Sequence, residues 1–241
     1  MEFQDLIEEQ LSYYRARARE YNQQFLRQGR YDTGTEHRAA WFRGIAALQQ
    51  AVEPLIEGKD VLELACGTGL WTSRLAAHSS RVLAVDAAPE MLSINRERLR
   101  TGNVEYCQAD IFSWAAPRAF DLVFFSFWLS HVPTGQFNDF WDNVRHALKP
   151  AGSVFFVDGL FEPTSTARDH DSIDRSGVVR RKLNDGREFQ IVKIFYEPSE
   201  LESRLSALGW NGWVRSTGKL FLYGLVGRTE GNERSLRGTM N

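Results

Sequence analysis

The sequence predicts an α/β fold in which helices cover both faces of a doubly wound, mostly parallel β-sheet. Short apolar runs alternate with helical segments from Asp60 to Asp158, which is the pattern of parallel strands joined by crossover helices. The runs at 122–125 and 154–157 are continuously apolar, as strands buried on both faces must be. The first run, 61–65, leads into the turn Gly67-Thr68-Gly69, at the edge where such sheets bind ligands.

The N-terminal part is expected to be helical. Apolar side chains recur at steps of three and four, which predicts one amphipathic helix of about 25 residues, at Ile7, Leu11, Tyr14, Ala18, Tyr21 and Phe25. A second helix is expected over 36–56. Residues 1–57 therefore form a helical segment ahead of the first strand.

The alternating part defines the core of the sheet. Strands are expected at 61–65, 81–86, 103–108, 120–126 and 152–158, and helices near 70–77, 89–100 and 135–148. Pro89 suits the first turn of a helix, Thr134 suits a cap, and Lys149-Pro150 ends the third helix. This core comprises 58–158 and, after an insertion, 197–227.

The pattern changes after Asp158. Residues 159–177 are polar, and two apolar-alternating runs, 178–183 and 187–196, flank Asn184-Asp185-Gly186 as in a β-hairpin. We expect this insertion, 159–196, to form a lid over the substrate. A helix at 198–209 and strands at 212–216 and 219–226 follow, and 228–241 is expected to be a flexible tail.

Composition restricts the partners and the location. The net charge of −2 shows no cationic excess, so nucleic acid is an improbable partner. Two cysteines without a Cys-x-x-Cys motif predict neither a disulfide framework nor a metal site. No run approaches the roughly 18–20 apolar residues of a membrane span. We expect a cytoplasmic monomer or homodimer that acts on a small molecule.

The ends of three strands supply the groups of a nucleoside site. Gly67 and Gly69 let the backbone approach a ligand, Asp86 is placed to accept hydrogen bonds from ribose hydroxyls, and Asp110 from an adenine amino group. A nicotinamide dinucleotide fold is the competing interpretation. Its fingerprint requires a third glycine where this chain has Thr72, which disfavours a pyrophosphate site.

Four segments resemble successive motifs of the class I S-adenosylmethionine-dependent methyltransferases, namely 61–69, 85–87, 108–111 and 120–123. The resemblance covers about 14–227. It implies a seven-stranded sheet whose last strand, 219–226, is inserted antiparallel between its neighbours. It also implies S-adenosyl-L-methionine as cofactor and S-adenosyl-L-homocysteine as product.

The resemblance also implies roles for individual residues. Glu63 supports the glycine loop, Gly67 and Gly69 pass under the methionine part, and the N-terminal helices within 1–57 cover the site. The remaining expected cofactor contacts are Tyr14, Tyr21, Ala65, Asp86, Ala87, Met91, Asp110, Ile111 and Ser126. For the two tyrosines, plain packing of amphipathic side chains is the alternative.

The segment after the fourth strand is where this family places acceptor-facing residues. His131 is the candidate general base, because histidine titrates near neutral pH, and a helix cap is its alternative role. Asp158 is expected to orient a base or a polar substrate. Trp128, His131 and Arg180 are the expected substrate contacts, although the cationic hairpin is also consistent with a solvated strand face.

These expectations combine into one main hypothesis. The chain is predicted to be a methyltransferase that methylates oxygen or nitrogen of a small molecule by in-line transfer, without a metal. Methylation of RNA or protein is one alternative. A non-catalytic protein that binds S-adenosylmethionine is another.

Overall fold

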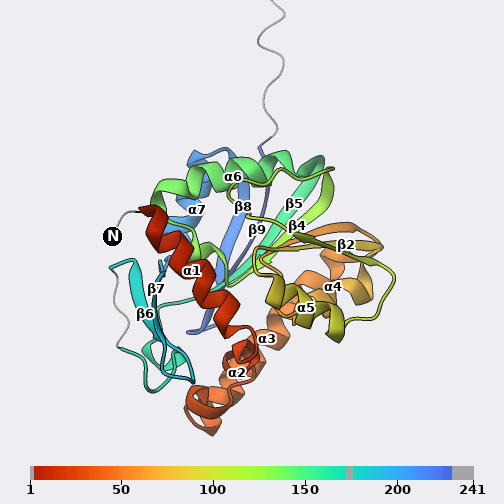
Figure 1. Ribbon diagram of the computed structural model, residues 1–241. Helices are drawn as coiled ribbons and strands as arrows, with labels where there is room; N and C mark the ends of the chain where they lie inside the picture. The colour runs from red at the N-terminus through yellow and green to blue at the C-terminus, as the bar shows by residue number, and fades with distance from the viewer. Residues whose placement is uncertain (1–2, 172–175, 230–241) are drawn as a thin grey trace, which may run out of the picture.

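The central sheet has seven strands in the order β3-β2-β1-β4-β5-β9-β8 (Figure 1). The computed structural model describes residues 3–171 and 176–229, so most of the predicted tail, 228–241, lies outside the described residues. The strands are β1 (Asp60–Leu64), β2 (Arg81–Asp86), β3 (Val104–Gln108), β4 (Phe120–Ser126), β5 (Leu148–Gly159), β8 (Trp210–Ser216) and β9 (Phe221–Arg228).

The direction of the strands confirms the expected class of fold. Strands β1 to β5 pair in parallel, whereas β9 pairs antiparallel with both β5 and β8. The strand order reverses between β1 and β4, because β2 and β3 lie on one side and β5 on the other. In such sheets the ligand binds beyond the carboxyl ends of the strands at this point.

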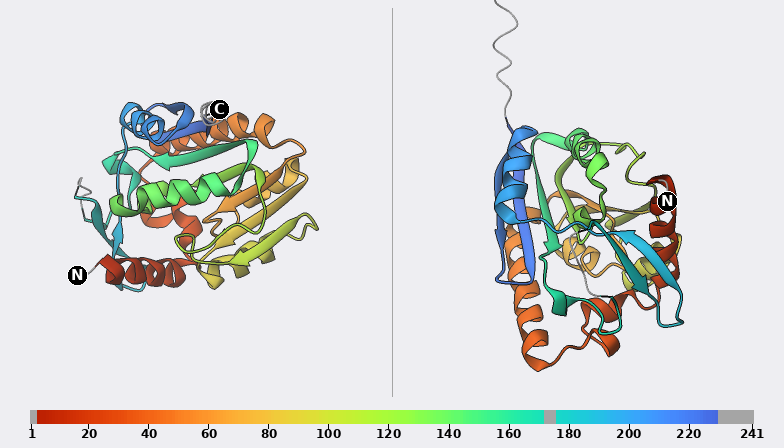
Figure 2. Two further views of the ribbon diagram at one scale, coloured as in Figure 1. Left: turned by 90° about the horizontal axis from the view of Figure 1, so that it is seen from above. Right: turned by 90° about the vertical axis from the view of Figure 1, so that its left-hand side faces the viewer.

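Helices cover both faces of the sheet (Figure 2). On one face lie α3 (Thr35–Ile56), α4 (Thr72–His78) and α5 (Pro89–Arg98), and on the other α6 (Phe137–His146) and α7 (Pro198–Ala207). Neighbouring strand residues alternate between the two cores: Phe124 packs with α3 and α4, Phe125 with α6 and α7. This two-sided burial explains the continuous apolar runs of the strands.

The N-terminal segment differs from the expected long helix. It forms α1 (Phe3–Arg17) and α2 (Tyr21–Phe25), separated by a turn. Arg17 is buried at this turn and donates hydrogen bonds to the hydroxyls of Tyr13 (2.9 Å) and Tyr31 (3.4 Å). Arg17 also donates a hydrogen bond to the Gln24 side chain of α2, across the break between the two helices. Helix α3 packs against the sheet rather than over its ligand-binding edge.

The expected hairpin is present as β6 (Val178–Lys182) and β7 (Glu188–Val192), which form a separate two-stranded sheet. It lies beside α1 at the edge of the molecule (Figures 1 and 2). Tyr13 of α1 packs with Val179, Leu183 and Ile191 of the hairpin in a small core of its own. Short 3-10 turns complete the fold at Gly29–Tyr31, Leu129–His131, Thr134–Gln136 and Pro163–Ser165.

No helix within residues 3–171 and 176–229 has both the length and the apolar character that a membrane span requires.

Candidate active site

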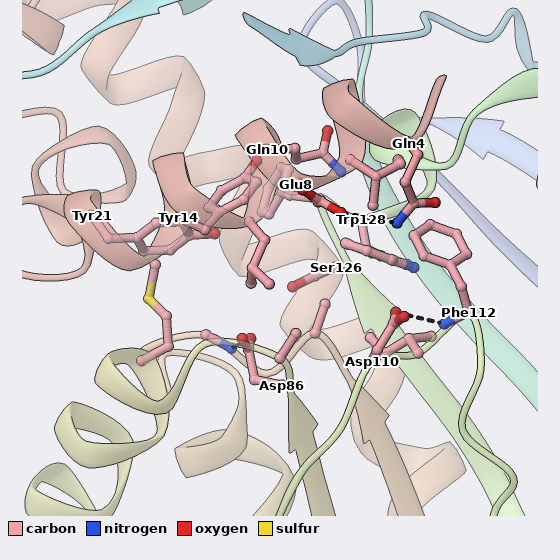
Figure 3. A pocket seen from close by; sticks show the side chains of 18 residues that line it. Gln4, Glu8, Gln10, Tyr14, Tyr21, Asp86, Asp110, Phe112, Ser126 and Trp128 are labelled. Atoms are coloured by element: carbon pink, nitrogen blue, oxygen red, sulfur yellow. Dashed lines mark hydrogen bonds between the residues drawn. The ribbon is translucent and has the colours of Figure 1, made fainter. Parts of the chain in front are cut away.

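A cavity of about 190 Å³ lies between α1 and the carboxyl ends of β1, β2 and β4. In Figure 3, Tyr14 of α1 lies across the cavity from Asp86, Asp110 and Ser126. The cavity therefore occupies the position at which the strand order reverses, with α1 as its cover. Most of the expected cofactor contacts line it, namely Tyr14, Tyr21, Ala65, Gly67, Asp86, Ala87, Met91, Asp110, Ile111 and Ser126.

Two expected contacts, Glu63 and Gly69, lie beneath the cavity rather than in its lining. Glu63 is 1% exposed, and burial raises the pKa of its carboxyl to about 8. A Cβ on Gly69 would lie 2.3 Å from Oδ1 of the buried Asn95, and its φ of +84° also favours glycine. Neither residue lines the cavity, so the supporting role of Glu63 and the place of Gly69 under the methionine part stay predictions.

Asp86 provides the acceptor that a ribose requires. Its two carboxylate oxygens accept hydrogen bonds from the backbone N–H groups of Gly67 and Ala88, each at 2.9 Å. Burial raises the pKa of Asp86 to about 6, although these hydrogen bonds act in the opposite direction. A carboxylate oxygen has a second lone pair, so Asp86 retains acceptor capacity toward the cavity.

The backbone around the cavity has an unusual conformation where ligand and chain must come close. Ala65 and Phe127, at the ends of β1 and β4, have left-handed φ values of 52° and 53°. Gly67 has φ 53°, and a Cβ there would come within 3.8 Å of the Tyr21 ring. Such conformations in non-glycine residues concentrate at functional sites.

The far end of the cavity suits a flat base. Asp110 lies in this wall with Ile111 and Phe112, and its Oδ1 accepts a hydrogen bond from the Phe112 N–H at 3.0 Å (Figure 3). Met91 lines the cavity as well. Acidic acceptors and apolar walls in one cavity fit the nucleoside part of S-adenosylmethionine.

Sequence reasoning missed several lining residues, namely Gln4, Ile7, Glu8, Gln10, Leu11, Phe112 and Phe127. The apolar stripe predicted Ile7 and Leu11 on the inner face of the N-terminal helix, but it did not predict that they line the cavity at the edge of the sheet. Trp128, expected at the substrate, lines this first cavity and packs on Phe112 with ring centroids 5.5 Å apart.

A second, smaller cavity of about 70 Å³ adjoins the first. Both are lined by Tyr14, Tyr21 and Phe127, so these rings form the boundary between the two spaces. His131 lines the second cavity together with Arg17, Arg181 and Lys193. The structure thus provides one space that fits the cofactor and a neighbouring one for an acceptor.

The hydrogen bonds of His131 define its tautomer. Nδ1 lies 2.6 Å from the carbonyl oxygen of Val192, which only accepts, so Nδ1 carries the proton. Nε2 lies 2.9 Å from the Tyr14 hydroxyl and accepts from it in the neutral ring. Burial, reinforced by the charge of Lys193, lowers the pKa of His131 well below its usual value, so the ring stays neutral at physiological pH.

Asp158 is fully buried next to this histidine segment. Its carboxylate accepts hydrogen bonds from the backbone N–H groups of Ser130 (2.8 Å) and Gly159 (2.7 Å), and lies 3.5 Å from Nζ of Lys193. Lys193 also contacts the Ser130 hydroxyl at 2.6 Å. This network fixes the backbone that leads into His131.

Arg180 and Arg181 lie on opposite faces of β6. Arg180 is exposed and pairs with Asp171 (2.8 Å) and Glu188 (3.5 Å), outside both cavities. Arg181 is 9% exposed and lines the second cavity. Substrate contact by Arg180 stays a prediction that this geometry does not favour. Within the described ranges, no group of three or more His, Cys, Asp or Glu side chains is arranged to hold a metal ion.

Comparison with known proteins agrees with this geometry. A family model described as a methyltransferase domain matches residues 61–152. The solved structure of DhpI in complex with SAH is 41% identical, with 93% of this chain and 98% of that chain aligned at a TM-score of 0.76. The chain belongs to the class I S-adenosylmethionine-dependent methyltransferases. S-Adenosylmethionine is accordingly the cofactor of this methyltransferase.

Further relatives have different names. A second DhpI structure, a DhpI-SAM-HEP complex, is 43% identical over 92% of this chain and 97% of that chain, with a TM-score of 0.75. Malonyl-[acyl-carrier protein] O-methyltransferase of Acetivibrio thermocellus and ubiquinone biosynthesis O-methyltransferase of Klebsiella pneumoniae are each 30% identical, over 59% and 64% of this chain. The matches span 48% and 60% of those two proteins.

Proposed function

We propose that this methyltransferase transfers a methyl group to oxygen or nitrogen of a small molecule that occupies the second cavity. The observation that carries this proposal is the position of His131, whose Nε2 faces the boundary between the two cavities through the Tyr14 hydroxyl. The cavity is small and lies beneath α1 and the hairpin, which suits a small acceptor better than RNA or protein. The relatives named as O-methyltransferases favour oxygen.

S-Adenosylmethionine, when bound, supplies an electrophilic methyl group on a sulfonium. The chain must then place the nucleophile in line with that methyl and exclude water, which can contribute about 7–11 kcal/mol. Residues Tyr14, Tyr21 and Phe127 surround the passage between the two spaces and keep it apolar. If the nucleophile is already deprotonated, alignment and exclusion of water are the only contributions that in-line transfer requires from the protein.

A hydroxyl acceptor must lose its proton, and His131 is the group that receives it. The pKa of Tyr14 is raised by burial, so its hydroxyl keeps its proton and can donate to Nε2. Because the single lone pair of Nε2 accepts from Tyr14, the proton is relayed: the Tyr14 oxygen takes the acceptor proton as the Tyr14 hydroxyl proton moves to Nε2. Asp158 acts as a positioning residue, because it holds Ser130 and Lys193 rather than the histidine ring.

The test is transfer of labelled methyl groups to a metabolite extract by the wild type and two histidine variants. His131→Asn is expected to lower kcat about 10²- to 10⁴-fold, the contribution of a general base, while affinity for S-adenosylhomocysteine stays unchanged. His146→Asn is the control, because His146 also bonds a backbone carbonyl (2.7 Å, Asp142) but is exposed on α6. Unchanged turnover in His131→Asn would remove the general-base role.

The same assay distinguishes the other functions. Label recovered on RNA or protein, and not in small molecules, would replace the proposed acceptor class. Tight binding of S-adenosylhomocysteine without transfer to any acceptor would indicate a non-catalytic protein. Absence of binding in calorimetry would overturn the proposed function as a whole.

A further inference from the structure

Three cations with little exposed surface surround the space behind Tyr14 and Tyr21: Arg17 and Arg181 are 5% and 9% exposed, and the side chain of Lys193 is 14% exposed. A third cavity, also of about 70 Å³, adjoins the second, and both are lined by Arg17, Arg181 and Lys193. These residues come from α1, β6 and the residue after β7, so they meet only because the hairpin packs on α1. None of the three is needed to form the cofactor cavity, whose lining does not include them.

Each cation has spare hydrogen-bonding capacity or neutral partners. Nη1 of Arg181 is buried with no hydrogen-bond partner among the described residues. Arg17, 5% exposed, donates to the hydroxyls of Tyr13 and Tyr31 and to the Gln24 side chain, all of them uncharged. Lys193 contacts Ser130 and Asp158.

The positive charges outnumber their carboxylate partners. Within the described part of the chain, Asp158 is the only carboxylate within ion-pairing distance of any of the three, at 3.5 Å from Lys193. Asp158 itself lines neither cavity; among the described residues that line them, Glu162 of the third cavity is the only acidic one, and its charge acts on His37. Burying unpaired charge is costly unless a counter-charge accompanies it.

The electrostatic environment of two of the cations, Arg181 and Lys193, is consistent with a missing counter-ion, whereas, against the effect of burial, the surrounding tyrosines raise the pKa of Arg17. Burial lowers the pKa of Arg181, and Arg17 lowers it further. Burial likewise lowers the pKa of Lys193, against the opposite effect of Asp158. An anion between these groups would relieve their mutual repulsion.

We infer that the acceptor carries an oxyanionic group, a carboxylate or a tetrahedral oxyanion, which Arg181, Arg17 and Lys193 bind behind Tyr14. The inference rests on the proposed function, since it assigns the substrate class of the same site. His131 and the three cations line one small cavity. The nucleophile and the anionic group are therefore separated by a few bonds, as in a short hydroxy acid. Guanidinium groups suit such oxyanions because they offer paired donors.

The anion would also support catalysis. Lys193, Arg181 and Arg17 all contribute to the lowered pKa of His131, after burial itself. An acceptor that neutralises them makes the histidine a stronger base when the correct substrate is present. A neutral analogue that lacks the oxyanion is expected to lose both affinity and turnover.

The experiment measures binding of inorganic phosphate and, separately, acetate to the protein saturated with S-adenosylhomocysteine. We expect at least one of the two anions to bind the wild type, and Arg181→Met to weaken that binding at least tenfold. Lys182→Met is the matched control, because it removes one positive charge from the exposed face of the same strand; its anion affinity is expected to stay within about twofold of the wild type. The preferred anion distinguishes a tetrahedral from a planar group.

Binding of S-adenosylhomocysteine is measured first, so that the two proposals fail separately. If it binds and neither anion does, or if Arg181→Met binds anions like the wild type, the oxyanion site is wrong while the methyltransferase proposal stands. Should Arg181→Met lose S-adenosylhomocysteine binding through misfolding, Lys193→Met takes its place in the same comparison. Retained anion affinity in that variant would equally overturn the site.

Discussion

Asp86 combines a binding role with an unfavourable position for its charge. Burial raises its pKa to about 6, yet the ribose hydroxyls that we expect it to bind are best held by the ionised carboxylate. Near neutral pH, above this raised pKa, Asp86 is mostly ionised despite its burial. Cofactor affinity is therefore coupled to the titration of this residue.

We expect affinity for S-adenosylhomocysteine to rise with pH through about 6 and to level off above it. The sign follows because the ligand prefers the deprotonated form, which the free protein populates above its raised pKa. Calorimetry between pH 5 and 8 measures the effect. Asp86→Asn is expected to bind more weakly at pH 8 and to lose most of the rise; a wild-type affinity that stays constant across this range contradicts the assignment.

At the scale of elements, Gln10 joins three segments that are far apart in sequence. The Gln10 amide donates to the carbonyl oxygen of His131 (3.2 Å) and accepts from the N–H of Val192 (3.0 Å). Helix α1, the turn of the candidate base and strand β7 are thus connected through one side chain that is 3% exposed. The carbonyl oxygen of Val192, in turn, orients the His131 ring by accepting a hydrogen bond from Nδ1.

Gln10→Leu is expected to loosen this junction. The change leaves a buried N–H and a buried C=O without partners, a cost of roughly 1–3 kcal/mol, so the Val192 amide should exchange with solvent about 10- to 100-fold faster. Gln4→Leu serves as the control, because Gln4 is exposed on the same helix and bonds Glu8 within it. Equal exchange rates at Val192 in the wild type and Gln10→Leu would show that the junction does not hold β7.

Contacts between elements far apart in the sequence, such as those of Gln10, are not predictable from local sequence patterns. The strands from β1 to β5 and the glycine turn follow from local patterns, because burial on both faces and the end of a strand are visible in neighbouring residues. The break between α1 and α2 is accompanied by contacts of Arg17 with Gln24 of α2 and with Tyr31, which the helical periodicity does not predict. Whether Arg180 or Arg181 points into the second cavity depends on which face of β6 packs on α1. The alternation of side chains along the strand does not reveal which face that is.

At the scale of the whole molecule, α1 and the hairpin form a unit distinct from the sheet. Their shared core contains Tyr13, Val179, Leu183 and Ile191, whereas the sheet has its own two cores. Outside that core, α1 is held by the bonds of Gln10 and Tyr14 to the His131 segment, by a small apolar cluster in which Ala18 meets Met91 of α5, and by the exposed pair Arg15–Glu90, which is worth little in water. Residues of this unit line both cavities, so its opening would widen access to them.

We expect α1 and β6–β7 to open together, and S-adenosylhomocysteine to close them together. Hydrogen exchange should slow in both elements on ligand addition, while the slow amides of β1 and β4 change little, because ligand binding to the closed form removes the open state. Val179→Ala, which removes two methyl groups from the shared core at a cost on the order of 1–2 kcal/mol, should speed exchange in α1 as well as in the hairpin. Ala109→Gly, outside that core, is the comparison. If Val179→Ala speeds exchange in the hairpin but leaves α1 at its wild-type rate, the two elements open independently, and access to the acceptor cavity does not require movement of the cofactor cover.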